Sequence, residues 1–303
     1  MASAEDLRIG FWNADLSRMG PGLLLRDIVR GTDPQVALAL DSVAALEADI
    51  LVLGDIDYDA ASAALSAFND RLPRPYPYLT ALRPNTGVPS GHDLDGNGRR
   101  DEARDAIGYG IFPGQGGMAV LSRLPLTPGR DFNGYFWRNL PGTLMPEGQP
   151  ADLPLSTTGH HETAVEFPDG RTLRLLTWHA TTPAFDGPED RNGRRNHDET
   201  AFWRQLLTGN LPLPPPDGPY VLIGQANADP DRGEGRPEAI TSLLKSPLLQ
   251  DPGGEATVDY GGDIGALRVA YILPSADLAI TAHGQLPPNN ASRHVPIWVE
   301  VDF

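Results

Sequence analysis

Residues 221–227 read Val-Leu-Ile-Gly-Gln-Ala-Asn, three branched apolar residues that run through a glycine into polar amides. A short apolar run of this kind is typical of a β-strand that is buried on both faces. Three other apolar segments end in the same way, before Asn13, Asp55 and His179. In open α/β sheets ligands gather beyond the strand ends, because the loops there are free to present side chains. The four strand ends together predict one ligand site.

Further strands and helices are predicted along the whole chain. Apolar runs and alternating patterns predict strands at residues 7–12, 49–53, 118–121, 163–167, 172–178, 220–223, 267–273 and 296–301. Helical spacing predicts helices at residues 33–48, 60–72, 196–207 and 239–245. Residues 73–115 are rich in Pro, Gly, Asn and Asp and are predicted as one long loop. Because no internal repeat or convincing boundary interrupts this pattern, we expect a single domain over residues 1–303.

The composition excludes several classes of protein. The chain has no Cys, which rules out a thiol nucleophile, a disulfide scaffold, a Cys-ligated zinc site and an iron–sulfur cluster. Its 40 acidic and 24 basic side chains give a net charge of −16, so we expect no non-specific nucleic-acid binding, although a local cationic pocket is compatible with this charge. No apolar run approaches the ~18 residues of a membrane span, so we expect no membrane-spanning segment. We also expect a monomer.

The N-terminus leaves the cellular compartment open. Residues 1–6 lack the basic and apolar parts of a signal peptide, whereas Ala2-Ser3-Ala4 is typical of the small-residue end of one. The chain therefore fits an extracytoplasmic protein whose signal has been removed as well as a cytoplasmic protein, and the absence of Cys tolerates either.

The order of the strand-end motifs resembles the endonuclease/exonuclease/phosphatase superfamily, the metal-dependent phosphoesterases related to DNase I, apurinic endonucleases and sphingomyelinases. The resemblance rests on residues 10–13, 49–59, 117–125, 177–180, 224–227, 267–273 and 292–296, and the loop at 185–193 is similar to that of a bacterial branch. It implies an α/β (α+β) fold, a four-layer αββα sandwich in which two mixed β-sheets pack face to face with helices outside. It also implies a phosphate-ester substrate and Mg²⁺ or Mn²⁺ as the cofactor.

Four residues match the functional positions of that superfamily. Asn13 stands where the superfamily has an Asn that binds metal and phosphate, and Asn227 matches the Asn of its Gly-Asp-x-Asn motif. His179 matches the His that contacts the scissile phosphate. His294 matches the C-terminal His, which stabilises the pentacoordinate phosphate or acts as an acid or base.

The carboxylates depart from the pattern. Asp55 or Asp57 replaces the usual metal-binding Glu, and Gln225 replaces the Asp that positions or deprotonates the attacking water. Ala270 replaces the Asp that orients the C-terminal His, and Arg293 replaces an Asp that is often a metal ligand. An amide is no general base at neutral pH, and each lost acid–base function costs ~10²–10⁴ in rate. The sequence therefore leaves two hypotheses, a divergent phosphoesterase and a catalytically silent relative that acts as a binding module.

Four arginines are candidate contacts for phosphate. Arg293 is suited to bidentate pairing with a phosphate oxygen, or to a structural ion pair. Arg123 ends a predicted strand and is either a phosphate clamp or a solvated strand cap. Arg194 and Arg195 lie in the charged segment 186–199, which is either a wall beside the substrate or a solvated loop of weak ion pairs.

The segment from Asp93 to Asp105 resembles a calcium loop. Asp93, Asp95, Asn97 and Asp101 place oxygens at spacings 1, 3, 5 and 9, with a glycine at position 6. The Glu expected at position 12 is absent, and Asp and Gly also dominate ordinary turns. The segment therefore predicts either a Ca²⁺ site or a turn.

Overall fold

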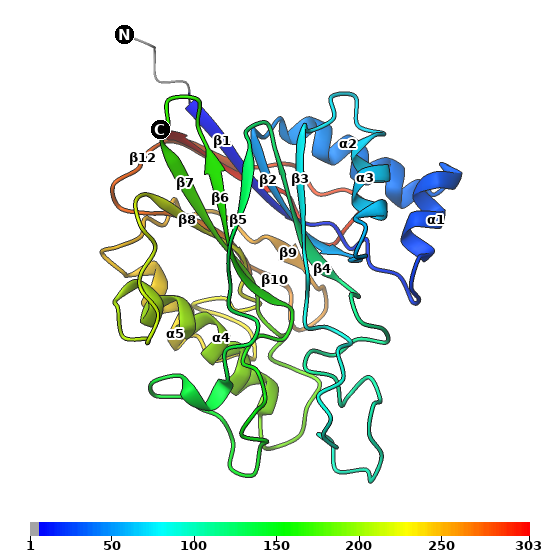
Figure 1. The fold of residues 1–303 in the computed structure, drawn as a ribbon, viewed down its shortest axis with the longest axis vertical. Helices are drawn as coiled ribbons and strands as arrows, with labels where there is room; N and C mark the ends of the chain where they lie inside the picture. Colours follow the sequence, from blue (N-terminus) through cyan, green and yellow to red (C-terminus); the bar gives the residue numbers. More distant parts are fainter. Residues whose placement is uncertain (1–5) are drawn as a thin grey trace.

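Two mixed β-sheets lie at the centre of the computed structural model, which describes residues 6–303 (Figure 1). The Ala2-Ser3-Ala4 segment lies outside the described residues. Helices flank the pair of sheets on opposite sides, which makes four layers. The predicted α/β sandwich is therefore confirmed.

The first sheet has six strands. Their order is β12 (Ala279–Gln285), β13 (Ile297–Asp302), β1 (Asp6–Asn13), β2 (Ile50–Ile56), β4 (Gly117–Ser122) and β3 (Tyr78–Leu82). Only the pair β1–β2 is parallel among these neighbours. The helices α1 (Leu23–Arg30), α2 (Pro34–Leu46) and α3 (Ala63–Asn69) cover its outer face.

The second sheet has five strands. Their order is β11 (Ala270–Pro274), β8 (Tyr220–Gln225), β7 (Thr172–His179), β6 (Gly159–Glu166) and β5 (Leu126–Asp131). Here β7–β8 is the parallel pair. The helices α4 (Arg191–Leu207) and α5 (Glu238–Leu244) cover it, and a 3₁₀ turn at Trp137–Asn139 and a short ladder of β9 (Val258–Asp259) and β10 (Ala266–Leu267) lie outside the sheet.

Side-chain alternation builds the layers. In β2, Leu51 and Leu53 join the core beneath α1–α3, whereas Ile50 and Val52 join the core between the two sheets. All four side chains are fully buried, as the apolar run at 49–53 predicts.

Two parallel pairs place the functional strand ends together. In the first sheet the last residue of β1, Asn13, lies beside Gly54 of β2. In the second, His179 of β7 lies beside Gln225 of β8, which in turn faces Ala270 of β11. Because parallel strands end at the same edge, each sheet brings two of the predicted strand ends side by side.

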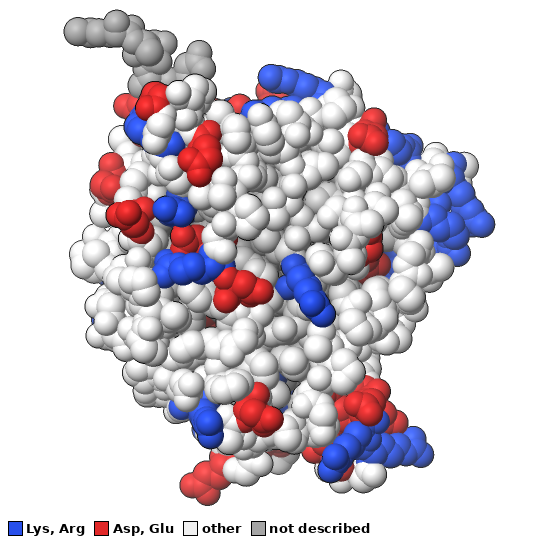
Figure 2. All heavy atoms as spheres, viewed as in Figure 1, with Lys and Arg blue, Asp and Glu red and all other residues white. Residues whose placement is uncertain are grey.

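Surface charge is dispersed over the face drawn in Figure 2, where acidic and basic side chains alternate with uncharged surface. Both signs gather on the projection at the lower right, where Figure 1 draws the segment between β3 and β4. No helix within residues 6–303 is long and apolar enough to cross a bilayer.

Candidate active site at the strand ends

A chain of buried amides joins the two sheets at the strand ends. Asn13 donates through Nδ2 to Oε1 of Gln225 at 2.7 Å, and Gln225 donates through Nε2 to Oδ1 of Asn227 at 2.6 Å. Asn227 in turn donates through Nδ2 to the carbonyl of Ala180 at 2.8 Å. The oxygen and the nitrogen of the Gln225 amide are thus both used in hydrogen bonds, to Asn13 and to Asn227. Gln225 is a positioning group and has no capacity to take a proton.

Two carboxyl groups meet beside this chain. Asp55 lies at the bulge of β2 between Gly54 and Ile56, and its side chain is within hydrogen-bonding reach of Asp15. Burial and the negative charges of Asp15 and Asp57 raise the pKa of Asp55 to about 7. Asp15 and Asp55 both have positive φ angles, 49° and 53°, which are uncommon for residues other than glycine. In the metal-free protein near neutral pH the carboxyl group of Asp55 is therefore protonated part of the time.

Asp57 has a different environment from Asp55. Its Oδ1 accepts the amide of Gly116 at 3.1 Å, and its Oδ2 accepts the amide of Arg18 at 3.0 Å. Burial raises its pKa, and these two hydrogen bonds oppose the rise. Asp57 ties two loops together, whereas Asp55 meets Asp15, so Asp55 is the better candidate of the two carboxylates for the site.

Asp15 is a site residue that sequence reasoning did not identify. Its Oδ2 accepts the hydroxyl of Ser292 at 2.9 Å and the amide of Arg293 at 3.1 Å. The only sequence signal is an acid two positions beyond the strand-end Asn13, in a stretch where turn-forming acids are common. Its partners, Ser292 and Arg293, are 277 and 278 residues away along the chain. The local sequence pattern therefore gave no reason to identify Asp15 as a site residue.

The two histidines lie close to this carboxylate and lack orienting partners. His294 is 7% exposed, and no donor or acceptor within residues 6–303 reaches its Nδ1 or that of His179. Burial and the charge of His294 lower the pKa of His179 to about 4, and burial lowers that of His294, whereas Asp15 acts in the opposite direction on both. Both rings are therefore neutral at pH 7. Ala270, where the resemblance to the family implies an orienting Asp, has no side-chain acceptor.

A cavity of about 920 Å³ adjoins the site, and His179 and Asn227 are among its lining residues. Its walls come from the segments 94–109 and 181–195. Phe185 and Tyr109 are lining residues that are largely exposed. The cavity is large enough for the part of a substrate that lies beyond the phosphate.

Arg195 and Arg194 face different surroundings. Arg195 lines this cavity, is nearly fully buried, and donates to the carbonyls of Leu155 at 2.9 Å and Pro154 at 2.6 Å. Burial lowers its pKa to about 10, so it stays charged at neutral pH. Arg194 donates instead to the carbonyls of Glu189 and Leu144 and is not among the lining residues. Of the two, Arg195 is the one that the fold presents to the cavity.

Arg123 and Arg293 are also placed differently. Arg123 follows β4, which runs antiparallel to β2, so it lies at the opposite edge of the sheet from Asp55. It packs on the ring of Tyr76, 3.9 Å from the centroid, and donates to two backbone carbonyls. The structure therefore does not bring Arg123 to the other candidates. Arg293 is exposed beside His294, where its charge helps to lower the pKa of that ring.

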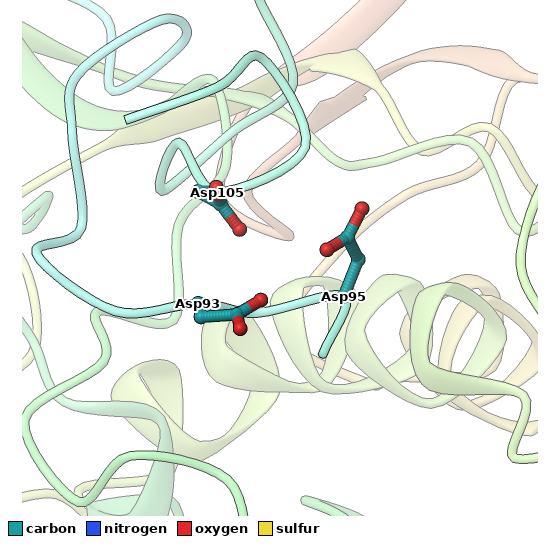
Figure 3. A group of neighbouring side chains, drawn as sticks. All are labelled: Asp93, Asp95 and Asp105. Atoms are coloured by element: carbon teal, nitrogen blue, oxygen red, sulfur yellow. The ribbon is translucent and has the colours of Figure 1, made fainter. Parts of the chain in front are cut away.

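The acidic segment after β3 forms a separate cluster. The carboxylates of Asp93, Asp95 and Asp105 point toward a common space, with ligand atoms within 4.8 Å of one another (Figure 3). Asp105 takes the place in this group that the sequence assigned to Asp101. Asn97 donates its backbone amide to Asp93 and Asp95, which closes the turn.

Calcium binding at this cluster stays a prediction. We expect Ca²⁺ added after chelation to raise the thermal midpoint by a few degrees, because a cation would offset the repulsion between three carboxylates. The effect should vanish in Asp93→Asn with Asp95→Asn. Differential scanning fluorimetry checks this, and a midpoint that Ca²⁺ leaves unchanged in the natural chain would assign the segment to an ordinary turn.

The pH dependence of stability follows from four buried groups of two kinds. Burial raises the pKa of Asp55 from 3.8 and of Glu199 from 4.5 to about 7, so these groups destabilise the folded state as pH rises from their ordinary values to 7, where only the unfolded chain gives up the two protons. Burial lowers the pKa of His160 to about 3 and of His179 to about 4, so these rings destabilise the folded state as pH drops below 6.5, where only the unfolded histidines take up protons. Because the two effects oppose each other below pH 6.5, we expect the thermal midpoint of the metal-free protein to change little from pH 5 to 6.5 and to fall from there to pH 7. Thermal midpoints from pH 5 to 8 in chelator test this, and a steady rise to pH 8 would contradict it.

A model of the endonuclease/exonuclease/phosphatase family matches residues 10–294. The chain belongs to this family. The resemblance predicted from the strand-end motifs is thus confirmed. Members of this family are phosphoesterases that generally depend on divalent metals. No protein with a curated description matches the chain.

Solved structures of the family share the fold over the whole chain. An endonuclease/exonuclease/phosphatase from Beutenbergia cavernae is 17% identical, with 98% of this chain and 72% of that chain covered and a TM-score of 0.59. A family protein from Leptotrichia buccalis is 14% identical, with coverages of 98% and 100% and a TM-score of 0.57. Sphingomyelinase C from Streptomyces griseocarneus is 18% identical, with coverages of 98% and 99% and a TM-score of 0.54. At these identities the likeness establishes the fold alone.

Proposed function

We propose that the chain is a divalent-metal-dependent phosphoesterase of low turnover that acts on a phosphomonoester or phosphodiester. The observation that carries this proposal is the position of Asp15, which meets the carboxyl group of Asp55 and lies close to two neutral histidines at the joined strand ends. Oxygen ligands for a hard cation and neutral donors for a phosphoryl group thus occur in one place.

The residues present fit a cation such as Mg²⁺ or Mn²⁺. Two carboxyl groups in contact repel each other without one, and this repulsion adds to the effect of burial in raising the pKa of Asp55. Gly116 also leaves room at this carboxylate, because a Cβ on Gly116 would lie 2.6 Å from Oδ1 of Asp55. We assign Asp55 as the carboxylate ligand, with the amide oxygens of Asn13 and Asn227 as the neutral candidates. Asp57 is the weaker alternative because its oxygens are used by backbone amides.

Each remaining group has a role that follows from its surroundings. A buried N–H without an acceptor costs more than a buried lone pair, so the bare Nδ1 atoms place the proton of His179 and of His294 on Nε2. Both rings then offer Nε2–H donors to phosphoryl oxygens, and the exposed guanidinium of Arg293 adds a bidentate donor. A bound cation supplies Lewis acidity at the phosphoryl group. Arg195 would contact the substrate beyond the phosphate, from the wall of the cavity.

Low turnover follows from two missing carboxylates. Gln225 holds Asn13 and Asn227 in place but accepts no proton from an attacking water. The ring of His294 lacks the acceptor that would fix its orientation. With each acid–base function worth ~10²–10⁴, we expect a rate several powers of ten below that of a complete site.

The same two observations favour a second candidate, a catalytically silent relative that uses the site and cavity for binding. The experiment that separates the candidates is cleavage of bis(p-nitrophenyl) phosphate and p-nitrophenyl phosphate with Mg²⁺, with Mn²⁺ and with chelator. We expect slow release of p-nitrophenol that requires the metal. Release equal to the buffer blank under every condition would favour the silent relative.

A further inference from the structure

The carboxylate of Asp15 lies against the backbone of Arg293. Its Oδ2 accepts the amide of Arg293 at 3.1 Å and the hydroxyl of Ser292 at 2.9 Å. The side chain of Arg293 itself is exposed. A negative charge is therefore present at the junction of β1 with the segment before β13, although the residue at 293 is a cation.

We propose that Asp15 is the second carboxylate ligand of the divalent cation, and that it compensates for the arginine at position 293. This inference rests on the proposed function and names a ligand that the sequence comparison with the family does not supply. Since both neighbouring donors bind Oδ2, the other oxygen, Oδ1, is left for a cation. Asp15 and Asp55 together restore two carboxylates to the site, the number that Mg²⁺ commonly uses.

A purely structural role explains the surroundings of Asp15 less well. Two hydrogen bonds to one oxygen are equally available to the amide oxygen of an Asn, and an Asn also tolerates the φ angle of 49°. A carboxylate at this place instead adds repulsion with Asp55. The charge of Asp15 acts to raise the pKa of His294 and of His179, so Asp15 lies close to both candidate phosphate contacts.

The two candidate amide ligands are weaker oxygen donors than the carboxylates, because both of their oxygens already accept hydrogen bonds. The oxygen of Asn13 accepts the backbone amide of Asp15 at 3.2 Å, and the oxygen of Asn227 accepts Nε2 of Gln225 at 2.6 Å. This leaves the carboxylates of Asp15 and Asp55 as the strongest oxygen donors at the strand ends.

Mn²⁺ binding tests the assignment without any assay of activity. The measurement is a titration followed by electron paramagnetic resonance, with Asp93→Asn and Asp95→Asn present in every sample so that the separate acidic cluster does not contribute. We expect Asp15→Asn to weaken Mn²⁺ binding about tenfold or more, since even changes outside the ligand shell cost ~10–100-fold. Asp231→Asn, an exposed site with the same change of charge, should leave the affinity within about twofold.

A relocated carboxylate separates a ligand from a structural residue. Arg293→Asp added to Asp15→Asn should recover most of the lost affinity, because the backbone at 293 already lies against the carboxylate of Asp15. The metal-free Asp15→Asn protein should also have an unchanged or higher thermal midpoint, because the carboxyl–carboxyl contact is removed. A lower midpoint together with a loss that Arg293→Asp does not repair would show a structural role and overturn the inference.

The outcomes also distinguish this inference from the proposed function. Mn²⁺ affinity that Asp15→Asn leaves unchanged, but that Asp55→Asn abolishes, would refute the role of Asp15 and leave the phosphoesterase site standing. No Mn²⁺ binding by the parent at all would overturn both.

Discussion

Gln225→Asp combined with Ala270→Asp is expected to raise metal-dependent cleavage of bis(p-nitrophenyl) phosphate by about a hundredfold or more over the natural chain. The first change supplies a base at the end of β8, where the natural amide has no capacity to accept a proton. The second places a carboxylate on β11, directly across from position 225 in the register, at the position that in the family orients the C-terminal histidine.

The structure gives reasons to expect that both changes are tolerated. An Asp at 225 keeps an oxygen that accepts from Nδ2 of Asn13, and it loses only the bond to Asn227. Ala270 borders a cavity of about 210 Å³, so space exists beside it for two further oxygens. The single variants are the controls, and each should show a smaller gain than the pair. Initial rates in Mn²⁺ measure the effect, and a folded double variant no faster than the natural chain would contradict the assignment of these two positions.

His179→Ala is expected to lower kcat by about 10²–10⁴-fold when it is introduced into that doubly substituted chain. His179 ends β7 and borders the large cavity, and its neutral ring is the donor assigned to the phosphoryl oxygen. The faster background makes such a loss measurable, because the natural rate is already low.

The matched control for this loss is His92→Ala, which removes a partly exposed imidazole that is hydrogen-bonded to Asp152. It should leave kcat within about twofold, since exposed substitutions away from a site have small effects. KM and the thermal midpoint of both variants show whether folding or binding changed. Equal kcat for His179→Ala and its parent would remove His179 from the catalytic group.

The strands that carry the site were predictable because both faces of each are buried. Strands β2 and β8 begin as continuous apolar runs; the predicted range of β8 lies within the observed one, and that of β2 starts one residue before it. Edge elements were missed for the opposite reason. Strand β5 contains Pro128 and Gly129, and β12 has no fully buried side chain, so neither shows an apolar pattern.

The helices show the same dependence on pattern. Helix α4 begins at Arg191, five residues before the predicted start, because its first turn is charged and polar and its buried members include Arg195. Helix α1 is short and lies between glycines, so its eight residues were left without a prediction.

The site residues divide by whether their position is set locally. Asn13, His179 and Gln225 each end a strand, so an apolar run followed by a polar residue was enough to find them. The same rule failed for Arg123, which also follows an apolar run. Its strand, β4, is antiparallel to β2 and therefore ends at the opposite edge of the sheet, and an apolar run does not reveal the direction of its strand. Asp15 is defined by contacts with Asp55 and Arg293, 40 and 278 residues away, which only the fold brings together.

The most direct test of the account is the position of Mn²⁺ in crystals of the natural chain, measured by anomalous diffraction at the manganese edge. The account predicts a peak between the carboxylates of Asp15 and Asp55, near His179 and His294. A well-ordered site with no peak there at saturating Mn²⁺, or a peak only at Asp93, Asp95 and Asp105, would contradict a metal-dependent active site at the strand ends.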